Sequence, residues 1–173
     1  MTNCSSMFMH LENVTNIYFI KFDTSQVVSI DNMFKNCTSI TKLDLSNFDT
    51  SSVKSMNHMF GYCSSLNKLN LSSFNTTSVL DMGFMFLYCS RLYYLDITNF
   101  DTSSVEYMRS MFLGSGLSSI NFTNFSTSSC KDVCGMFAVM GNLISINLST
   151  FDTSKVTTMD SMFAYSHYVK YID

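Results

Sequence analysis

The stretch from Leu43 to Phe60, LDLSNFDTSSVKSMNHMF, decides the fold because its motifs recur along the whole chain. Its Met-Phe pair returns every 25 or 26 residues, with copies that start at Met7, Met33, Met59, Met85, Met111, Met136 and Met162. Its Phe-Asp-Thr-Ser element keeps the same interval, with copies at Phe22, Phe48, Phe74, Phe100, Phe125 and Phe151. Two independent motifs with one period indicate a repeat protein.

Two kinds of apolar spacing alternate within each unit. Residues 43–45, Leu-Asp-Leu, alternate apolar and polar side chains, as a short half-buried strand does. Val53, Met56, Met59 and Phe60 then follow at i, i+3, i+6 and i+7, a spacing that places them on one face of a helix. Each unit is therefore predicted to hold one strand and one short helix.

The predicted helix begins near Ser51 and ends near Gly61, after the N-capping residue types Asp49 and Thr50. One strand and one helix cannot bury their apolar sides alone, but stacked copies can. We therefore predict an α/β right-handed solenoid with about seven 26-residue repeats, spanning 1–173 as a single domain. The parallel β-sheet is expected on the concave face and the short helices on the convex face.

Composition narrows the range of functions. Only 13% of the 173 residues are charged and the net charge is −3, so nucleic acid is not an expected partner. Polar residues interrupt every apolar run, so direct membrane insertion is not expected either. The first residues lack the basic and apolar segments of a secretory signal, which leaves an intracellular location open.

The unit M-F-x-x-C-S-x-L-x-x-L-x-L-S-x-F-D-T-S-x-V-x-x-M resembles the 26-residue repeat of the BspA-like (DUF285) class of leucine-rich-repeat surface proteins. The resemblance covers essentially the whole chain. It implies a leucine-rich-repeat solenoid on a cell surface or outside the cell, used for adhesion to matrix, host proteins or neighbouring cells.

Solenoids commonly bind on the concave sheet, so its exposed positions are the first candidates for a binding site. We predict a polar contact surface for a protein or glycan ligand, made by Tyr18, Lys42, Asp44, Lys68, Asn70, Tyr93, Tyr94, Asp96, Asn121 and Asn147. The alternative interpretation is a merely soluble sheet face that stacked Asn and Asp side chains stabilise.

A second candidate surface is apolar. Leu80, Phe84 and Leu87 lie at i, i+4 and i+7 of the third predicted helix, where other units carry polar residues, and Tyr107 and Leu113 flank them. The hypothesis is a convex contact patch for a partner or for self-association. The alternative is that the patch packs under a loop.

The cysteine and histidine residues give little indication of a metal site or a catalytic site. Cys37, Cys63 and Cys89 share one position of the unit, where Ser115, Met140 and Ser166 stand in later units. This interchange predicts a row of reduced, buried thiols. Cys130 and Cys134 could suit a metal, but no third ligand recurs nearby, so no metal or other cofactor is predicted.

Catalysis is not predicted. His10, His58 and His167 fall at different positions of distant units and cannot converge. We therefore expect a non-enzymatic protein-protein recognition module of a cell-surface protein. The alternative is a structural, self-assembling component of a filament or larger complex, because the chain begins and ends partway through a unit. Such ends predict either a fragment of a longer array or self-association through uncapped ends.

Overall fold

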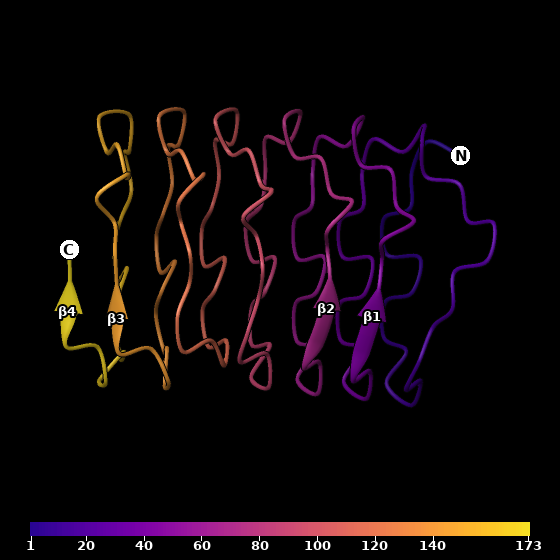
Figure 1. Ribbon diagram of the computed structural model, residues 1–173, viewed down its shortest axis with the longest axis horizontal. Coiled ribbons are helices and arrows are strands. Elements are labelled where there is room, and N and C mark those ends of the chain that lie inside the picture. Colours follow the sequence, from indigo (N-terminus) through magenta and orange to yellow (C-terminus); the bar gives the residue numbers. More distant parts are fainter.

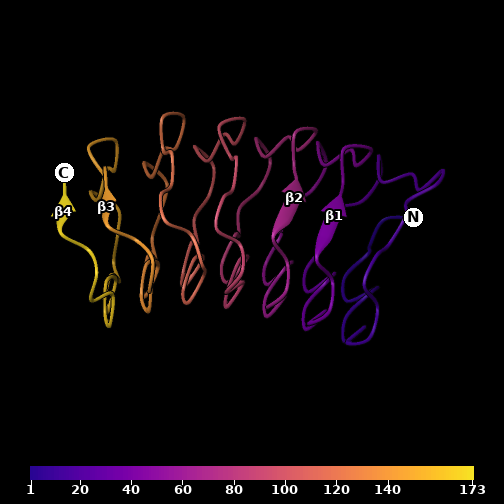
Figure 2. The same ribbon diagram turned by 60° about the horizontal axis from the view of Figure 1, so that its bottom comes forward.

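The computed structural model describes residues 1–173 as one row of stacked, flattened coils (Figure 1). The amino terminus lies at one end of the row and the carboxyl terminus at the other, and the turned view in Figure 2 shows successive coils side by side. This arrangement agrees with the predicted repeat solenoid. No helix of the chain is long or apolar enough to cross a membrane.

Four short strands lie at corresponding positions of their coils (Figure 1). Strand β1, Lys42–Asp44, pairs in parallel with β2, Lys68–Asn70, and strand β3, Ser145–Ile146, pairs in parallel with β4, Tyr171–Ile172. The strands therefore form two separate two-stranded sheets. The prediction of one continuous sheet through the Leu-x-Leu segments is wrong for the units between them.

The continuous pairing between units lies elsewhere in the coil. Parallel bridges connect the equivalent residues Asn3, Ser29, Ser55, Asp81, Tyr107, Asp132 and Thr158. Around one bridge, the backbone N–H of Ile30 donates to the carbonyl of Ser55 at 3.2 Å, and that of Asn32 donates to the carbonyl of Asn57 at 2.8 Å. The parallel stacking of neighbouring units is thus carried by this segment, which we call the turn segment (residues 27–37 and their equivalents).

The chain contains no helix, so the predicted helix from Ser51 to Gly61 is wrong, and so are its equivalents in the other units. The segment forms consecutive turns instead. The N–H of Met59 donates to the carbonyl of Met56 at 3.2 Å, three residues back rather than the four of an α-helix. His58, within this turn, has a φ of 54°, which a right-handed helix does not allow.

Apolar residues three apart are compatible with such turns as well as with a helix, because the N–H of each buried residue can donate to the carbonyl of the buried residue three positions earlier. The remaining carbonyl groups point along the stack, where N–H groups of the preceding unit satisfy them, as the bond from the N–H of Phe34 to the carbonyl of Met59 at 2.9 Å shows. Asp49 does not cap a helix either. Its Oδ1 accepts the N–H of Ser51 at 3.0 Å, the geometry of an Asx turn.

The core consists of columns of equivalent side chains. Successive rings of the Met-Phe motif stack with centroids 5.4 to 5.9 Å apart, in a column formed by Phe8, Phe34, Phe60, Phe86, Phe112, Phe137 and Phe163. In the inner units most methionine, valine and leucine positions of the unit are also buried, whereas in the last unit Met159 is exposed and Val156 and Met162 are only half-buried. The core positions that the repeat predicts are therefore confirmed.

The cysteine position of the unit adds a polar contact to this core. Cys37, Cys63 and Cys89 are buried and free. The thiol of Cys63 donates to the carbonyl of Phe34 at 3.0 Å, and in a later unit the hydroxyl of Ser166 donates to the carbonyl of Phe137 at 2.6 Å. Cys and Ser interchange in these units because both can donate this hydrogen bond; Met140 at the same position cannot donate, and its sulfur accepts the hydroxyl of Ser115 at 3.3 Å.

Candidate functional site

The ten polar side chains predicted to meet a ligand are all exposed. Apart from Tyr93, which lies next to Tyr94, they occupy two positions of the unit, those of Lys42 and Asp44 on β1. We call the surface formed by these two positions in successive units the strand face. Leu43, between them, is buried and points into the core. The alternation of the Leu-x-Leu motif thus places the polar side chains outward even in units where no strand forms.

The carboxylates and amides of the strand face have a structural role that the sequence interpretation missed. The Oδ1 atom of Asp44 accepts the backbone N–H of Ser46 at 3.1 Å and closes an Asx turn. Equivalent bonds, 2.8 to 3.1 Å long, are formed by Asn70, Asp96, Asn121 and Asn147. Local turn geometry therefore accounts for the Asp and Asn at this position without a ligand.

Hydrogen bonding also fixes the charge of these carboxylates. Bonds from Ser46 lower the pKa of Asp44, and bonds from Thr98 lower the pKa of Asp96. Both side chains are therefore ionised at neutral pH.

A groove of about 430 Å³ crosses the first part of the strand face. It brings together six of the ten predicted residues, namely Tyr18, Lys42, Asp44, Lys68, Asn70 and Tyr94. Asn16 and Asn67 also line it and were not among the predicted site residues. The groove is the main concave feature in which predicted binding residues converge.

The other predicted residues lie apart from this groove. Asp96 lines a smaller hollow of about 260 Å³ beside Asn70, and Asn121 and Asn147 line another of about 310 Å³. Tyr93 is 57% exposed and lines none of these hollows. The structure therefore divides the predicted surface into one larger groove and two minor ones.

The predicted apolar patch is not one continuous surface. Leu80 and Tyr107 are exposed, Phe84 and Leu113 are half-buried, and Leu87 is only 6% exposed. The prediction placed Leu87 on the outer side of a helix, but a run of turns replaces that helix and Leu87 is buried, although it is not part of the core cluster.

Comparison with known proteins identifies the family. Residues 2–116 and 91–171 match the family model described as "Mycoplasma protein of unknown function, DUF285". The chain belongs to the DUF285 family. The resemblance to BspA-like leucine-rich-repeat proteins is thereby confirmed.

Among solved structures, the DUF285 chain is similar to a leucine-rich repeat protein from Bacteroides ovatus, with 21% sequence identity and a TM-score of 0.45. The match covers 85% of this chain and 41% of that protein, so the chain spans less than half the length of this relative. A search of the curated proteins found no match.

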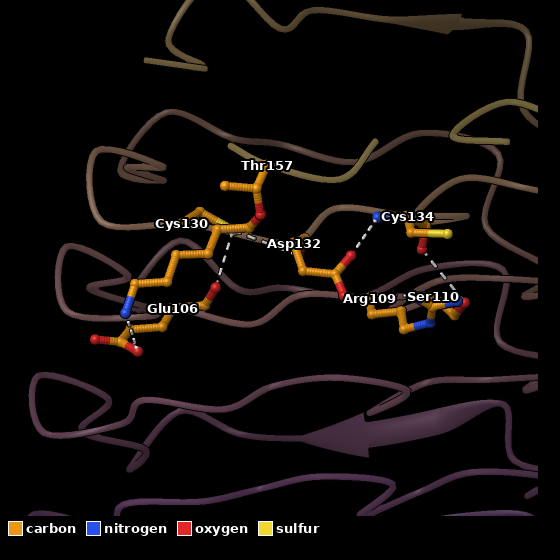
Figure 3. A network of polar contacts seen from close by, with 8 residues as sticks. Glu106, Arg109, Ser110, Cys130, Asp132, Cys134 and Thr157 are labelled. Atoms are coloured by element: carbon orange, nitrogen blue, oxygen red, sulfur yellow. Dashed lines mark hydrogen bonds and ion pairs between the residues drawn. The ribbon is translucent and has the colours of Figure 1, made fainter. Parts of the chain in front are cut away.

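Two ion pairs join neighbouring units of the DUF285 chain in the turn segment. Lys131 donates to Glu106 at 2.7 Å and Arg109 donates to Asp132 at 3.3 Å (Figure 3). Asp132 also accepts the backbone N–H of Cys134 at 2.9 Å. These contacts join neighbouring units.

Cys130 and Cys134 border the same network (Figure 3). Cys130 is buried, and burial raises the pKa of its thiol. No group of three or more His, Cys, Asp or Glu side chains is arranged to hold a metal ion. Cys130 belongs to the core cluster, whereas Cys134 is only half-buried.

Proposed function

We propose that this DUF285 chain is a non-enzymatic recognition module that binds a protein or glycan ligand through the strand face of a right-handed stack of about seven units. The observation that carries the proposal is the groove, in which side chains from four successive units converge on one exposed surface. A repeat array presents such a surface without moving any backbone, because each unit is fixed by its neighbours.

The lining of the groove supports binding rather than catalysis. It contains tyrosine, lysine and asparagine side chains but no histidine, cysteine, serine or threonine. Its carboxylate, Asp44, is ionised and already engaged in an Asx turn. A nucleophile with an adjacent base, the usual sign of covalent catalysis, is not part of this lining.

We further propose that the protein acts on a cell surface, in adhesion to matrix, host proteins or neighbouring cells. This part of the proposal is supported by the resemblance of the repeat to BspA-like surface proteins. Exposed tyrosines on the strand face fit this role, because tyrosine supplies a large contact area at a small cost in side-chain entropy.

Adhesion of protein-coated beads to a reconstituted extracellular-matrix layer tests the proposal. The variant carries Tyr18→Ala and Tyr94→Ala, which remove side chains that are 81% and 73% exposed in the groove. The matched control carries Tyr165→Ala and Tyr168→Ala, at side chains that are 74% and 63% exposed outside the groove. We expect adhesion by the wild type and the control and its loss in the groove variant.

Absence of adhesion by the wild type, or equal adhesion by both variants, would contradict the proposed function. Urea-unfolding midpoints of all three proteins confirm that the variants fold.

A second candidate function is self-assembly into a filament or larger complex. It is favoured by Leu80 and Tyr107, two exposed side chains on adjacent units, where the N–H of Tyr107 donates to the carbonyl of Leu80 at 3.2 Å. Light scattering over a concentration series tests this function. Growth in mass that Leu80→Glu abolishes would support it, and a constant mass would exclude it.

A further inference from the structure

The groove on the strand face contains two lysines that lack a carboxylate partner. Lys42 on β1 and Lys68 on β2 are directly opposite each other in the parallel register, on strands roughly 4.8 Å apart. Both side chains are exposed, and neither forms an ion pair. Like charges opposite each other in a sheet repel, and no carboxylate of the protein pairs with either lysine.

The nearest carboxylate does not neutralise this pair. Oδ1 of Asp44 accepts the N–H of Ser46 at 3.1 Å and the Nδ2–H of Asn70 at 3.2 Å. Asn70 in turn accepts the N–H of Ser72 at 3.1 Å. Asp44 is thus held at the Asx turn. The groove contains two ammonium groups and one carboxylate, so its net charge is positive. The net charge of the whole chain, in contrast, is −3.

Aromatic rings stand at both ends of the groove. Tyr18 comes from the first unit and Tyr94 from the fourth, three unit spacings away, which corresponds to roughly 14 Å along the stack. Between them along the stack lie the two lysines and the amide of Asn67, while the amide of Asn16 lies in the same unit as Tyr18. The rings are therefore placed to contact the two ends of one elongated ligand that also meets both ammonium groups.

We propose that this groove binds an acidic polysaccharide, with carboxylates of the sugar paired to Lys42 and Lys68 and sugar rings packed against Tyr18 and Tyr94. This inference rests on the proposed function and names its ligand class. The paired lysines supply the charge complementarity, and the asparagine amides supply donors and acceptors for sugar hydroxyl groups.

The shape of the groove favours a polysaccharide over an acidic peptide. Protein partners depend on apolar anchor residues that enter well-packed pockets. The apolar residues beneath this groove already belong to the core, because Leu43 is buried and Ile17 and Leu69 pack against the core cluster. Ile17 and Leu69 line the groove but are half-buried against the core, so little apolar surface is left for an anchor residue, and the rest of the lining is lysine, amide, carboxylate and tyrosine apart from the buried Leu43.

Calorimetric titration with hexagalacturonate and with a hyaluronan hexasaccharide tests the ligand class. Maltohexaose serves as the neutral sugar and hexaglutamate as the acidic peptide. We expect measurable binding of at least one acidic sugar that weakens with salt, and tighter binding than that of maltohexaose or hexaglutamate. Lys42→Gln and Lys68→Gln should each weaken binding about tenfold, whereas the exposed Lys54→Gln outside the groove should leave it unchanged.

Three results would overturn the inference: no binding of either acidic sugar, equal affinity in the lysine variants, or tighter binding of hexaglutamate than of both sugars. If bead adhesion still depends on Tyr18 and Tyr94 in any of these cases, the recognition function stands and only the ligand class is wrong. If adhesion does not depend on the groove, the proposed function itself fails.

Discussion

The hydroxyl of Thr50 donates a hydrogen bond to the backbone carbonyl of Asn75 in the next unit, and the N–H of Asn75 donates back to the same hydroxyl, both at 2.8 Å. The side chain thus acts as both donor and acceptor between two units. Bonds from the same threonine position to the next unit are formed by Thr24, Thr76, Thr102 and Thr127, all of which are buried.

Thr50→Val is expected to destabilise the stack by about 1–3 kcal/mol, because it leaves a carbonyl and an N–H of Asn75 without their buried partner. Thr50→Ser keeps the hydroxyl and should recover most of that loss. Urea unfolding followed by circular dichroism measures both. Equal stability of the valine variant and the wild type would show that the threonine column contributes little.

Gly116 should tolerate no side chain. A Cβ on this residue would collide with the backbone carbonyl group of Ser90 in the preceding unit, and backbone cannot move aside as a flexible side chain can. We expect Gly116→Ala to cost about 1–3 kcal/mol of unfolding free energy, as overpacking does. Gly141→Ala is the matched control, because a Cβ there meets no atom within 4 Å. Equal thermal unfolding midpoints for the two variants would contradict this account.

The stability of the chain is expected to fall below pH 6.5 in part through His58. Its ring stacks on Phe84 with centroids 4.3 Å apart, and burial, with a contribution from Lys35, lowers the pKa of His58 from 6.5 to about 4. The folded state therefore disfavours the protonated ring, and this contribution is present above pH 6.5 and is lost as the pH falls towards 4.

His58→Phe isolates this effect, because the next unit carries Phe84 at the same position with a similar φ, 59° against 54°. Between pH 6.5 and 4 the variant should lose less stability than the wild type in urea titrations. Parallel losses in the two proteins would mean that other groups carry the pH dependence.

The loss of folding stability at alkaline pH should depend on the buried thiols. Burial raises the pKa of Cys89 from 9.0 to about 12, so the unfolded chain releases this proton at a lower pH than the folded chain does. Stability from the neutral thiol is complete below pH 9 and declines between pH 9 and 12.

Cys89→Ser keeps a donor for the carbonyl of Phe60, which the thiol reaches at 3.1 Å, and removes the titrating group. Unfolding midpoints measured over the same pH range should therefore decline less in the serine variant. An unchanged slope would assign the alkaline loss to other groups.

The sequence predicts the stacking and the core of this protein well. The residues that recur every 26 positions are the same residues that form the buried columns, such as the stack of Phe34 on Phe60. It does not predict the local backbone. Apolar residues three apart occur both in helices and in consecutive turns, and Asp before Ser or Thr is typical of helix caps and of Asx turns alike. The neighbouring unit decides between them: N–H groups of one unit donate to carbonyl groups of the next, and these are bonds that a helix would close within itself.

The candidate site, too, could be predicted from the sequence only in part. Exposure of Tyr18, Lys42 and Lys68 follows from the alternation of the Leu-x-Leu motif, which is a local property. The Asx role of Asp44 depends on a turn two residues further on, and the convergence of four units on one groove depends on the stack. Neither can be derived from the pattern of a single unit.

The bonds between units join equivalent positions at each interface, from Asn3 to Ser29 through to Asp132 to Thr158. A duplication or loss of a whole repeat in the gene would therefore create junctions between the same equivalent backbone positions that already pair in the protein, and the array could lengthen or shorten in steps of one unit. Insertion or deletion of a single residue within a unit is different. The interval from Met111 to Met136 is 25 residues instead of 26, and within it Gly116 lies against the backbone of Ser90. Copy number in this family is thus expected to vary more freely between related strains than repeat length does.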